Sequence, residues 1–188
     1  LTSFAIDNSD SSDADDAISF DGEKVWVHIA DVATQVDIDS ELDGYAQKRA
    51  SNLYLPDQTI HMLPPNLSSL CSLGESEKSS ALSVGFKMIE CQISDIKILQ
   101  SESNVVKMSY EEADKALKED KVVSKLNVLA KSHKAFRNEN GAIKLDLPNV
   151  DVKIKNKKVD IQIQTDSESR KLVAEMMVIA GRVIAQYA

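Results

Sequence analysis

The chain is poor in the features that mark several common protein classes. Its only two cysteines, Cys71 and Cys91, show no Cys-x-x-Cys spacing, and no His-x-His pair accompanies them, which argues against a zinc site and a disulfide scaffold. We expect both thiols to be reduced and buried. No apolar run approaches the ~20 residues that a transmembrane helix needs. The chain begins LTSFAID, with neither an initiator methionine nor a charged-then-apolar leader, so we expect an excised piece of a longer protein without a signal peptide.

Positive charge is also scarce. Lysine and arginine number 22 against 30 aspartates and glutamates, which gives a net charge of −8. Nucleic-acid-binding proteins normally carry a basic surface, so this composition does not favour that class. The hydrophobic fraction of 43% is ordinary for a globular protein, and 188 residues suffice for a real core. The composition predicts a single domain over residues 1–188.

The chain does contain an unusual acidic stretch between two short apolar runs. The apolar runs at 4–6 and 17–20 are typical of strands. Between them, five aspartates fall within ten positions: Asp7, Asp10, Asp13, Asp15 and Asp16. Two carboxylates about 5 Å apart repel by roughly 0.8 kcal/mol in water, but by about 3 kcal/mol at an effective dielectric constant near 20. Carboxylates held against a core therefore need cations, and converging oxygen ligands suit Mg²⁺, Mn²⁺ or Ca²⁺.

Composition alone leaves open that this stretch is a solvated Ser/Asp-rich surface turn. A calcium loop of the EF-hand type does not fit, because that loop requires glycine at its sixth position and glutamate at its twelfth. Counted from Asp7, these positions hold Ser12 and Ile18. Counted from Asp10, they hold Asp15 and Asp21.

The remaining patterns predict a mixture of strands and helices. In the first half we expect a hairpin over 17–32 turning at Asp21-Gly22, a helix over 39–51, a helical turn at 64–70, and two or three antiparallel strands within 80–109. In the second half we expect helices at 110–118 and 122–138, and strands at 142–146 and 151–164 with a turn at Asn156-Lys157. A last helix should run from Ser167 to the end. These elements predict an α+β fold, with mixed, largely antiparallel sheets packed against helices.

Two residues within these elements have alternative interpretations. His28, in the expected hairpin, is more often a packed or hydrogen-bonded histidine than a metal ligand. Apolar residues cover more than one face of the final helix, so we expect it to be deeply buried, with close packing at Ala180 and Gly181. Glu175 needs a partner in so apolar a helix, which makes it a candidate site residue.

Four motifs in the first 73 residues resemble, in the same order, those of the ribonuclease II/R (RNB) family of exoribonucleases. They are Ile6-Asp7 with DADDAI (13–18), VHIADV (27–32), LDGYAQKRASNLYLP (42–56) and IHMLPPNLSSLCSL (60–73). The segment SRKLVAEMMVIAGRVIA (169–185) resembles a family helix more weakly. The resemblance implies an RNB-like catalytic domain that lacks its C-terminal part, with its arginine-rich motif, and any flanking RNA-binding domains.

The resemblance also implies a function. Mg²⁺, with Mn²⁺ as an alternative, would be held by Asp7, Asp13, Asp15 and Asp16, and single-stranded RNA would be hydrolysed 3′ to 5′ to nucleoside 5′-monophosphates. Asp15 would be the most sensitive position. Tyr54 would stack on a base of the RNA, and Glu175 is a further candidate for substrate binding. We expect no organic cofactor, no membrane association, and a monomer in the cytoplasm, with an organelle as the alternative.

The sequence departs from the family pattern at two places. Ala174 stands where the family usually has a second acid, and Leu145 stands where many relatives carry a phenylalanine that clamps the terminal base. Tyr54 also has a simpler interpretation as a core strand residue. Two other functions stay open: a catalytically inactive relative that binds RNA as a scaffold, and a structural domain stabilised by calcium.

Overall fold

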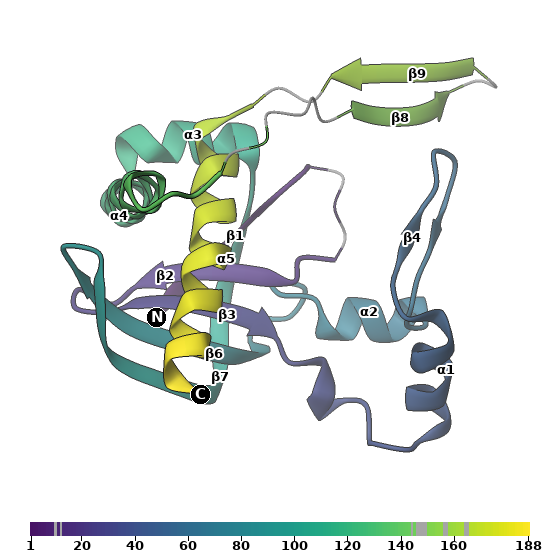
Figure 1. Cartoon of the computed structure of the whole chain (residues 1–188). Coiled ribbons are helices and arrows are strands. Elements are labelled where there is room, and N and C mark those ends of the chain that lie inside the picture. The colour runs from purple at the N-terminus through teal and green to yellow at the C-terminus, as the bar shows by residue number, and fades with distance from the viewer. Residues whose placement is uncertain (10, 12, 144, 146–149, 156–157, 164–165) are drawn as a thin grey trace.

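The computed structural model describes residues 1–9, 11, 13–143, 145, 150–155, 158–163 and 166–188 (Figure 1). The strands are β1 (Thr2–Asp7), β2 (Asp16–Phe20), β3 (Val25–Ala30), β4 (Leu53–Tyr54), β5 (Thr59–Ile60), β6 (Ser79–Ile89), β7 (Gln92–Ser109), β8 (Val150–Lys155) and β9 (Lys158–Ile163). The helices are α1 (Glu41–Arg49), α2 (Pro65–Cys71), α3 (Tyr110–Glu119), α4 (Lys121–Glu139) and α5 (Glu168–Tyr187), with a 3₁₀ turn at Val32–Thr34. The fold is α+β, as the sequence predicts.

Five strands form a closed barrel in the order β1-β2-β3-β6-β7. Neighbouring strands are antiparallel except where β1 runs parallel to β7 and closes the barrel. This parallel pairing places Asp7 opposite Ser109, while the β2–β3 pairing places Asp16 opposite Ile29. The barrel therefore fixes both ends of the acidic stretch.

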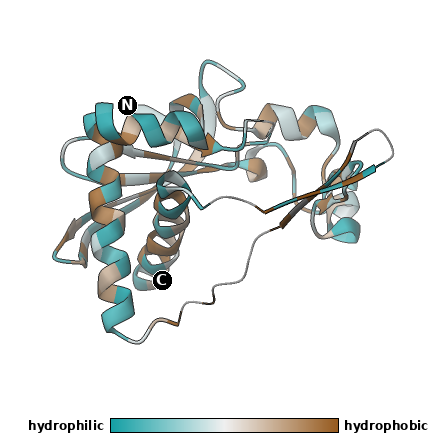
Figure 2. Cartoon of the chain, turned by 90° about the horizontal axis from the view of Figure 1, so that it is seen from above, coloured by the Kyte–Doolittle hydropathy of each residue, from teal (hydrophilic) through white to brown (hydrophobic). Residues whose placement is uncertain are grey.

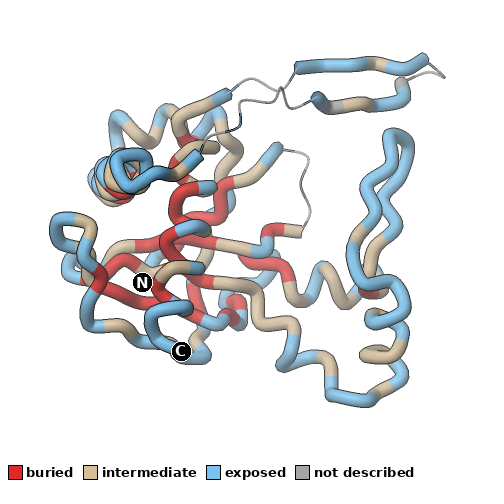
Figure 3. Tube along the Cα trace, in the orientation of Figure 1, coloured by how far each residue is buried: buried red, intermediate tan, exposed pale blue. Residues whose placement is uncertain are grey.

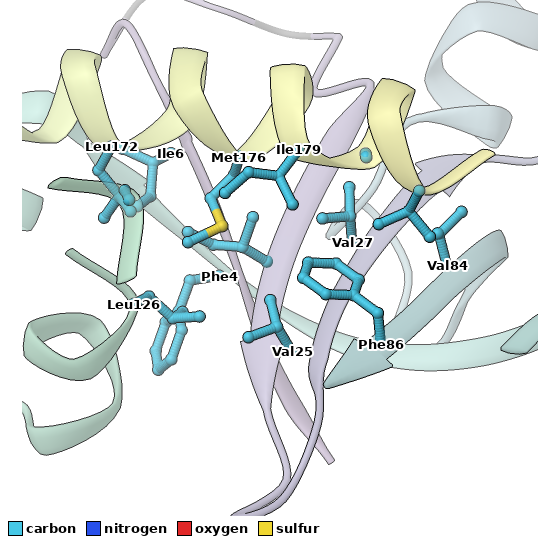
Figure 4. Close-up of a cluster of buried hydrophobic side chains, with 14 of the residues drawn as sticks. Phe4, Ile6, Val25, Val27, Val84, Phe86, Leu126, Leu172, Met176 and Ile179 are labelled. Atoms are coloured by element: carbon cyan, nitrogen blue, oxygen red, sulfur yellow. The ribbon is translucent and has the colours of Figure 1, made fainter. Parts of the chain in front are cut away.

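Helix α5 packs across the outside of the barrel and covers its apolar face (Figure 4). Figure 4 shows side chains of β1, β3 and β6 meeting those of α4 and α5, and all of them are buried: Phe4, Ile6, Val25, Val27, Val84, Phe86, Leu126, Leu172, Met176 and Ile179. In Figure 3 the buried segments of the chain lie mainly where the barrel and the helix are in contact. Burying each large apolar side chain contributes roughly 1.5–3 kcal/mol, so this contact holds the barrel and the helix together.

Two hairpins, β4–β5 and β8–β9, lie away from the barrel (Figure 1). They meet through a hydrogen bond of 3.0 Å from the Ile154 N–H to the Pro56 carbonyl. Cross-strand pairs on one face of β8–β9 are all β-branched and apolar: Val150 with Ile163, Val152 with Ile161, and Ile154 with Val159. Figure 2 shows this hairpin at the end of the molecule opposite the two chain termini.

Most of the expected elements are present. Ser40 caps α1 by accepting a hydrogen bond from the Asp43 N–H, and 80–109 forms two strands. The expected strand at 142–146 is wrong for the residues described there, because Ala142, Ile143 and Leu145 have no regular structure. The expected turn at 156–157 lies outside the described residues.

Two burial predictions are also wrong. Helix α5 buries one face only, since Val178 and Ile184 are each 42% exposed and Gly181 lies on the exposed side. Cys71 and Cys91 are free thiols, as expected, but both are partly exposed rather than buried. Among the helices that the structure describes, none is both long enough and apolar enough to cross a membrane.

Candidate active site

The acidic stretch is held at its ends by strands and in its middle by one small buried residue. Asp7 is the last residue of β1, and Asp16 is the first residue of β2. Between them, Ala14 is buried, and its carbonyl accepts a hydrogen bond of 2.9 Å from the Leu73 N–H. The Asp15 carbonyl accepts another, of 2.8 Å, from the Ala30 N–H. These contacts hold the segment around Ala14 against the barrel.

Asp13 and Asp15 lie on the same side of this segment, as the alternation in DADD predicts. Both line a cavity of about 400 Å³, whose wall also includes Ile29, Ala30, Ser51, Asn52, Met62, Leu63 and Ser72. Asp7 and Ala14 line a second cavity of about 330 Å³, together with Asn8, Ser109 and Glu112. The acidic stretch therefore lines two cavities and contributes carboxylates to both.

The aspartates are close enough to change one another's pKa. Desolvation, followed by the charges of Asp7 and Asp15, raises the pKa of Asp16 to about 6. Asp15 reaches solvent, yet desolvation by the protein around it, followed by the charges of Asp13 and Asp7, also raises its pKa. The four carboxylates thus form one electrostatic cluster.

The aspartates share a neighbourhood but do not meet at one point. Within the described part of the chain, no three Asp, Glu, His or Cys side chains are placed so that they could hold a metal ion. The chemistry of the donors fits a hard divalent cation, because carboxylate oxygens are the ligands that Mg²⁺ and Mn²⁺ prefer. The raised pKa values of Asp15 and Asp16 fit as well, because desolvation and, secondly, the neighbouring carboxylates disfavour their ionised forms, which a cation would stabilise. Asp10 lies outside the described residues.

Tyr54 is exposed next to the larger cavity. Its side chain is 67% exposed on β4, so its interpretation as a core residue is wrong. Asn52, which lines that cavity, donates through Nδ2 to the Tyr54 hydroxyl at 3.2 Å and accepts from the Met62 N–H at 2.7 Å. The Tyr54 side chain is therefore largely in solvent, and its hydroxyl contacts a residue of the cavity wall.

Glu175 has its partner elsewhere. It is 4% exposed and accepts hydrogen bonds from His133 Nδ1 at 2.6 Å and from Arg137 Nε and Nη2 at 2.8 and 2.7 Å. Desolvation alone would raise its pKa, but the bonds from Arg137 and His133 outweigh that effect and lower it. Glu175 lines neither of the two cavities beside the aspartates.

His28 is a packed, hydrogen-bonded strand residue, as expected. Its two ring nitrogens bond to Ser19 Oγ at 2.8 Å and Ser83 Oγ at 2.6 Å. Burial, with a smaller effect of the N-terminal ammonium, lowers the pKa of His28 to about 4. The His28 ring therefore contributes to the packing of the barrel, and neither of its nitrogens is available to bind a metal.

Sequence reasoning missed two residues beside the cluster, Tyr110 and Arg170. The Arg170 guanidinium lies over the Tyr110 ring, 3.8 Å from its centroid, and donates a hydrogen bond to Asn8 Oδ1. Desolvation, followed by the charge of Asp7, raises the pKa of Tyr110. Both residues come from helix starts more than ninety positions from the acidic stretch, and no local pattern marks them.

Comparison with known proteins identifies the family. The family model described as RNB domain matches residues 1–188, so the chain belongs to the RNB-domain family. It is 32% identical to ribonuclease R of Chlamydia pneumoniae over 203 residues, which cover all of this chain and 30% of that protein. The chain thus spans about a third of the length of the curated relatives it matches.

Solved structures share the fold. Apo ribonuclease R of Mycoplasma genitalium matches with a TM-score of 0.85 and 25% identity, covering 96% of this chain and 31% of that one. The same enzyme has been solved in complex with double-stranded RNA and with ribose-methylated single-stranded RNA, and these structures match at TM-scores of 0.86 and 0.84. Yeast Ssd1, described as a pseudonuclease, matches with a TM-score of 0.71 and 22% identity over 93% of this chain and 23% of its own, which shows a shared fold alone.

Proposed function

We propose that the protein is a 3′–5′ exoribonuclease that hydrolyses single-stranded RNA to nucleoside 5′-monophosphates. Membership of the RNB-domain family supports a ribonuclease. The observation that carries the proposal is the electrostatic cluster of Asp7, Asp13, Asp15 and Asp16 beside a cavity of about 400 Å³. An anionic substrate reaches such a cluster only with a cation between them.

Mg²⁺, with Mn²⁺ as an alternative, is the cation that we propose for these four aspartates. When bound, it would supply Lewis-acid stabilisation of the phosphoryl oxygens and lower the pKa of a bound water. The carboxylates of Asp13 and Asp15 face the cavity where the terminal phosphodiester would lie. Asp7 and Asp16 are fixed in strands, and their charge favours the cation in the same place.

In the proposed reaction, water adds to the phosphorus and the bond to the 3′ oxygen of the preceding nucleotide breaks. The released nucleotide carries a 5′-phosphate, and the shortened RNA keeps a 3′-hydroxyl. Tyr54 would position the terminal nucleotide, because a base stacked on an aromatic ring gains about 1–3 kcal/mol whatever its sequence. The exposure of Tyr54 and its contact with Asn52 in the cavity wall support this role.

The test is Asp15→Asn in the full-length protein. Turnover of labelled single-stranded RNA should fall roughly a hundredfold or more, the scale of losing one preorganised electrostatic contact, while RNA affinity persists. Asp37→Asn, an exposed aspartate outside the cluster, is the matched control and should keep wild-type turnover. RNA labelled at either end, with monophosphate release as the readout, establishes the direction. Unchanged turnover by Asp15→Asn would refute the proposed role.

A catalytically inactive RNA-binding relative is the second candidate. Two observations favour it: the described residues offer no ready three-ligand metal geometry, and a pseudonuclease shares the fold. Melting temperatures with Mg²⁺, Mn²⁺ and Ca²⁺, together with RNA cleavage, separate the cases. An inactive relative would bind RNA without cleaving it, and a calcium-stabilised structural domain would be stabilised most by Ca²⁺ and would not cleave.

A further inference from the structure

The start of α5 is tied to the acidic cluster by a chain of contacts through Asn8. Arg170, in the first turn of α5, donates to Asn8 Oδ1. The Asn8 N–H in turn donates to Asp7 Oδ1 at 2.7 Å. One arginine thus reaches a cluster carboxylate through a single intermediate residue.

Arg170 is itself held in place by α3. Its guanidinium lies over Tyr110, 3.8 Å from the ring centroid, which is a favourable cation–π distance. Tyr110 follows Ser109, the β7 residue paired with Asp7 at the closure of the barrel. The ring therefore sets the guanidinium beside the end of β1.

The two helix starts are also joined directly. Ser169 Oγ donates to the Tyr110 carbonyl at 3.0 Å, and the Ser169 N–H donates to Asp114 Oδ1 at 2.9 Å. Ser169 is fully buried, and both bonds are partly buried. The backbone that carries Arg170 is therefore held against α3, which fixes the position of Arg170 relative to β1.

We propose that Arg170 is a positioning residue for the acidic cluster: through Asn8 it holds the Asp7 carboxylate in the orientation that binds the divalent cation. This inference rests on the proposed function. Partners that orient a metal ligand typically change metal affinity by about 10–100-fold when removed. Because Asn8 is exposed and Arg170 is only partly buried, the lower end of that range applies.

The sign of the effect separates positioning from charge. Arg170 carries a positive charge near the aspartates, so by charge alone Arg170→Gln would strengthen Mg²⁺ binding. A positioning role predicts the opposite, because the Asp7 carboxylate loses its orientation. Arg170→Lys keeps the charge but loses the planar group that meets both the ring and Asn8, so positioning predicts an intermediate loss.

The experiment measures Mg²⁺ binding to the full-length protein without RNA, by isothermal titration calorimetry, and then Mg²⁺-dependent RNA cleavage. We expect Arg170→Gln to raise the dissociation constant for Mg²⁺ about tenfold, with an equal rise in the Mg²⁺ concentration for half-maximal cleavage. Asn8→Ala should do the same, and the double variant should show no further loss, because both substitutions break one link.

Lys171→Ala is the matched control. Lys171 is the next residue of the same helix turn, and it pairs with Asp166 and Glu168 rather than with the acidic stretch. It removes an equal charge and should leave Mg²⁺ binding unchanged. Tyr110→Phe keeps the ring and should also bind Mg²⁺ as wild type does, whereas Tyr110→Leu should weaken binding in the same direction as Arg170→Gln.

Three outcomes would overturn the inference while wild type binds Mg²⁺ and cleaves RNA. These are unchanged or tighter Mg²⁺ binding by Arg170→Gln, equal losses in Arg170→Gln and Lys171→Ala, or a raised KM for RNA with normal Mg²⁺ binding, which would make Arg170 a substrate contact. Failure of the wild-type protein to bind Mg²⁺ or to cleave would instead refute the proposed function. Thermal unfolding of each variant distinguishes loss of the link from loss of the fold.

Discussion

Glu175 offers a sharp test of whether a buried acid in α5 serves the fold or the substrate. Its carboxylate is 4% exposed and accepts three hydrogen bonds, one from His133 and two from Arg137. These bonds join α5 to α4. The substitution Glu175→Gln keeps the side-chain volume but removes the charge and one acceptor oxygen.

The tautomer of His133 follows from its other neighbour, Arg182. Arg182 Nη1 lies 3.1 Å from His133 Nε2 and also donates to the Cys91 carbonyl at 3.2 Å. Because an arginine can only donate, Nε2 must accept, and Nδ1 must carry the proton that bonds to Glu175. The amide nitrogen of a glutamine would therefore face either this N–H or those of Arg137, with donor opposite donor.

The cost can be estimated from these contacts. A buried donor left without an acceptor costs about 1–3 kcal/mol, and His133 is fully buried. The loss of charge-assisted bonds to Arg137 adds less than in a sealed pair, because that side chain is 34% exposed and water replaces part of them. Glu175→Gln should lower the free energy of unfolding by about 3 kcal/mol, which is a fall of roughly 6–12 °C in melting temperature.

The pH dependence has a definite sign. The folded pKa of Glu175 lies below its ordinary value of 4.5. Its contribution to stability is therefore fully present above that ordinary value and is lost as the pH falls through the folded pKa. The difference between wild type and Glu175→Gln should shrink in the same acidic range.

Urea denaturation of both proteins measures the effect, and Glu168→Gln is the control. Glu168 lies on the same helix, but its side chain is 44% exposed and it pairs with Lys131 and Lys171, so its loss should be below about 1 kcal/mol. An unchanged free energy of unfolding for Glu175→Gln, combined with a raised KM for RNA, would refute the structural role. That result would instead support the substrate contact expected from the sequence.

Two further predictions concern Gly85 and Asp16. A β-carbon at Gly85 would lie 2.4–2.6 Å from the Trp26 ring, so Gly85→Ala should lower the free energy of unfolding by about 1–3 kcal/mol in urea titrations. The control is Gly44→Ala in helix α1, where a β-carbon would have nothing within 4 Å and should cause no loss. Equal stability of both variants would contradict this packing. The folded pKa of Asp16, about 6, exceeds its ordinary 3.8, so its stabilising contribution is fully present below that ordinary value and is lost as the pH rises through 6. Without divalent cations, the free energy of unfolding of Asp16→Asn should therefore exceed that of wild type by about 1–2 kcal/mol in thermal unfolding at about pH 8, and a less stable variant would contradict the raised pKa of Asp16.

Local patterns predicted most elements because each has a local cause. Asp21-Gly22 turns the β2–β3 hairpin, and Ser40 caps α1, as the residue types indicate. The closure of the barrel has no such cause. It depends on a parallel pairing of β1 with β7 about a hundred positions away, which is set by packing of the whole sheet.

The same distinction holds at the candidate site. Alternation along DADD places Asp13 and Asp15 on one side, and both line one cavity. The link from Arg170 to Asn8 joins residues 162 positions apart and depends on how α5 crosses the barrel. The sequence pattern also could not predict which face of α5 is buried, because apolar residues such as Val178 remain exposed where nothing in the described chain covers them.

The contacts that hold the four aspartates determine which of them could reorient to bind one cation together. Asp7 and Asp16 belong to strand ladders, so moving either would break pairing with Ser109 or Ile29. Asp13 and Asp15 belong to the connecting segment, whose described backbone bonds to the barrel come from Leu73 and Ala30. If one cation binds all four, we expect the Asp13 and Asp15 side chains to reorient toward Asp7 and Asp16, because the strand residues are the more firmly held. Repulsion opposes that movement until a divalent cation arrives, so cation binding and closure of the site should occur together.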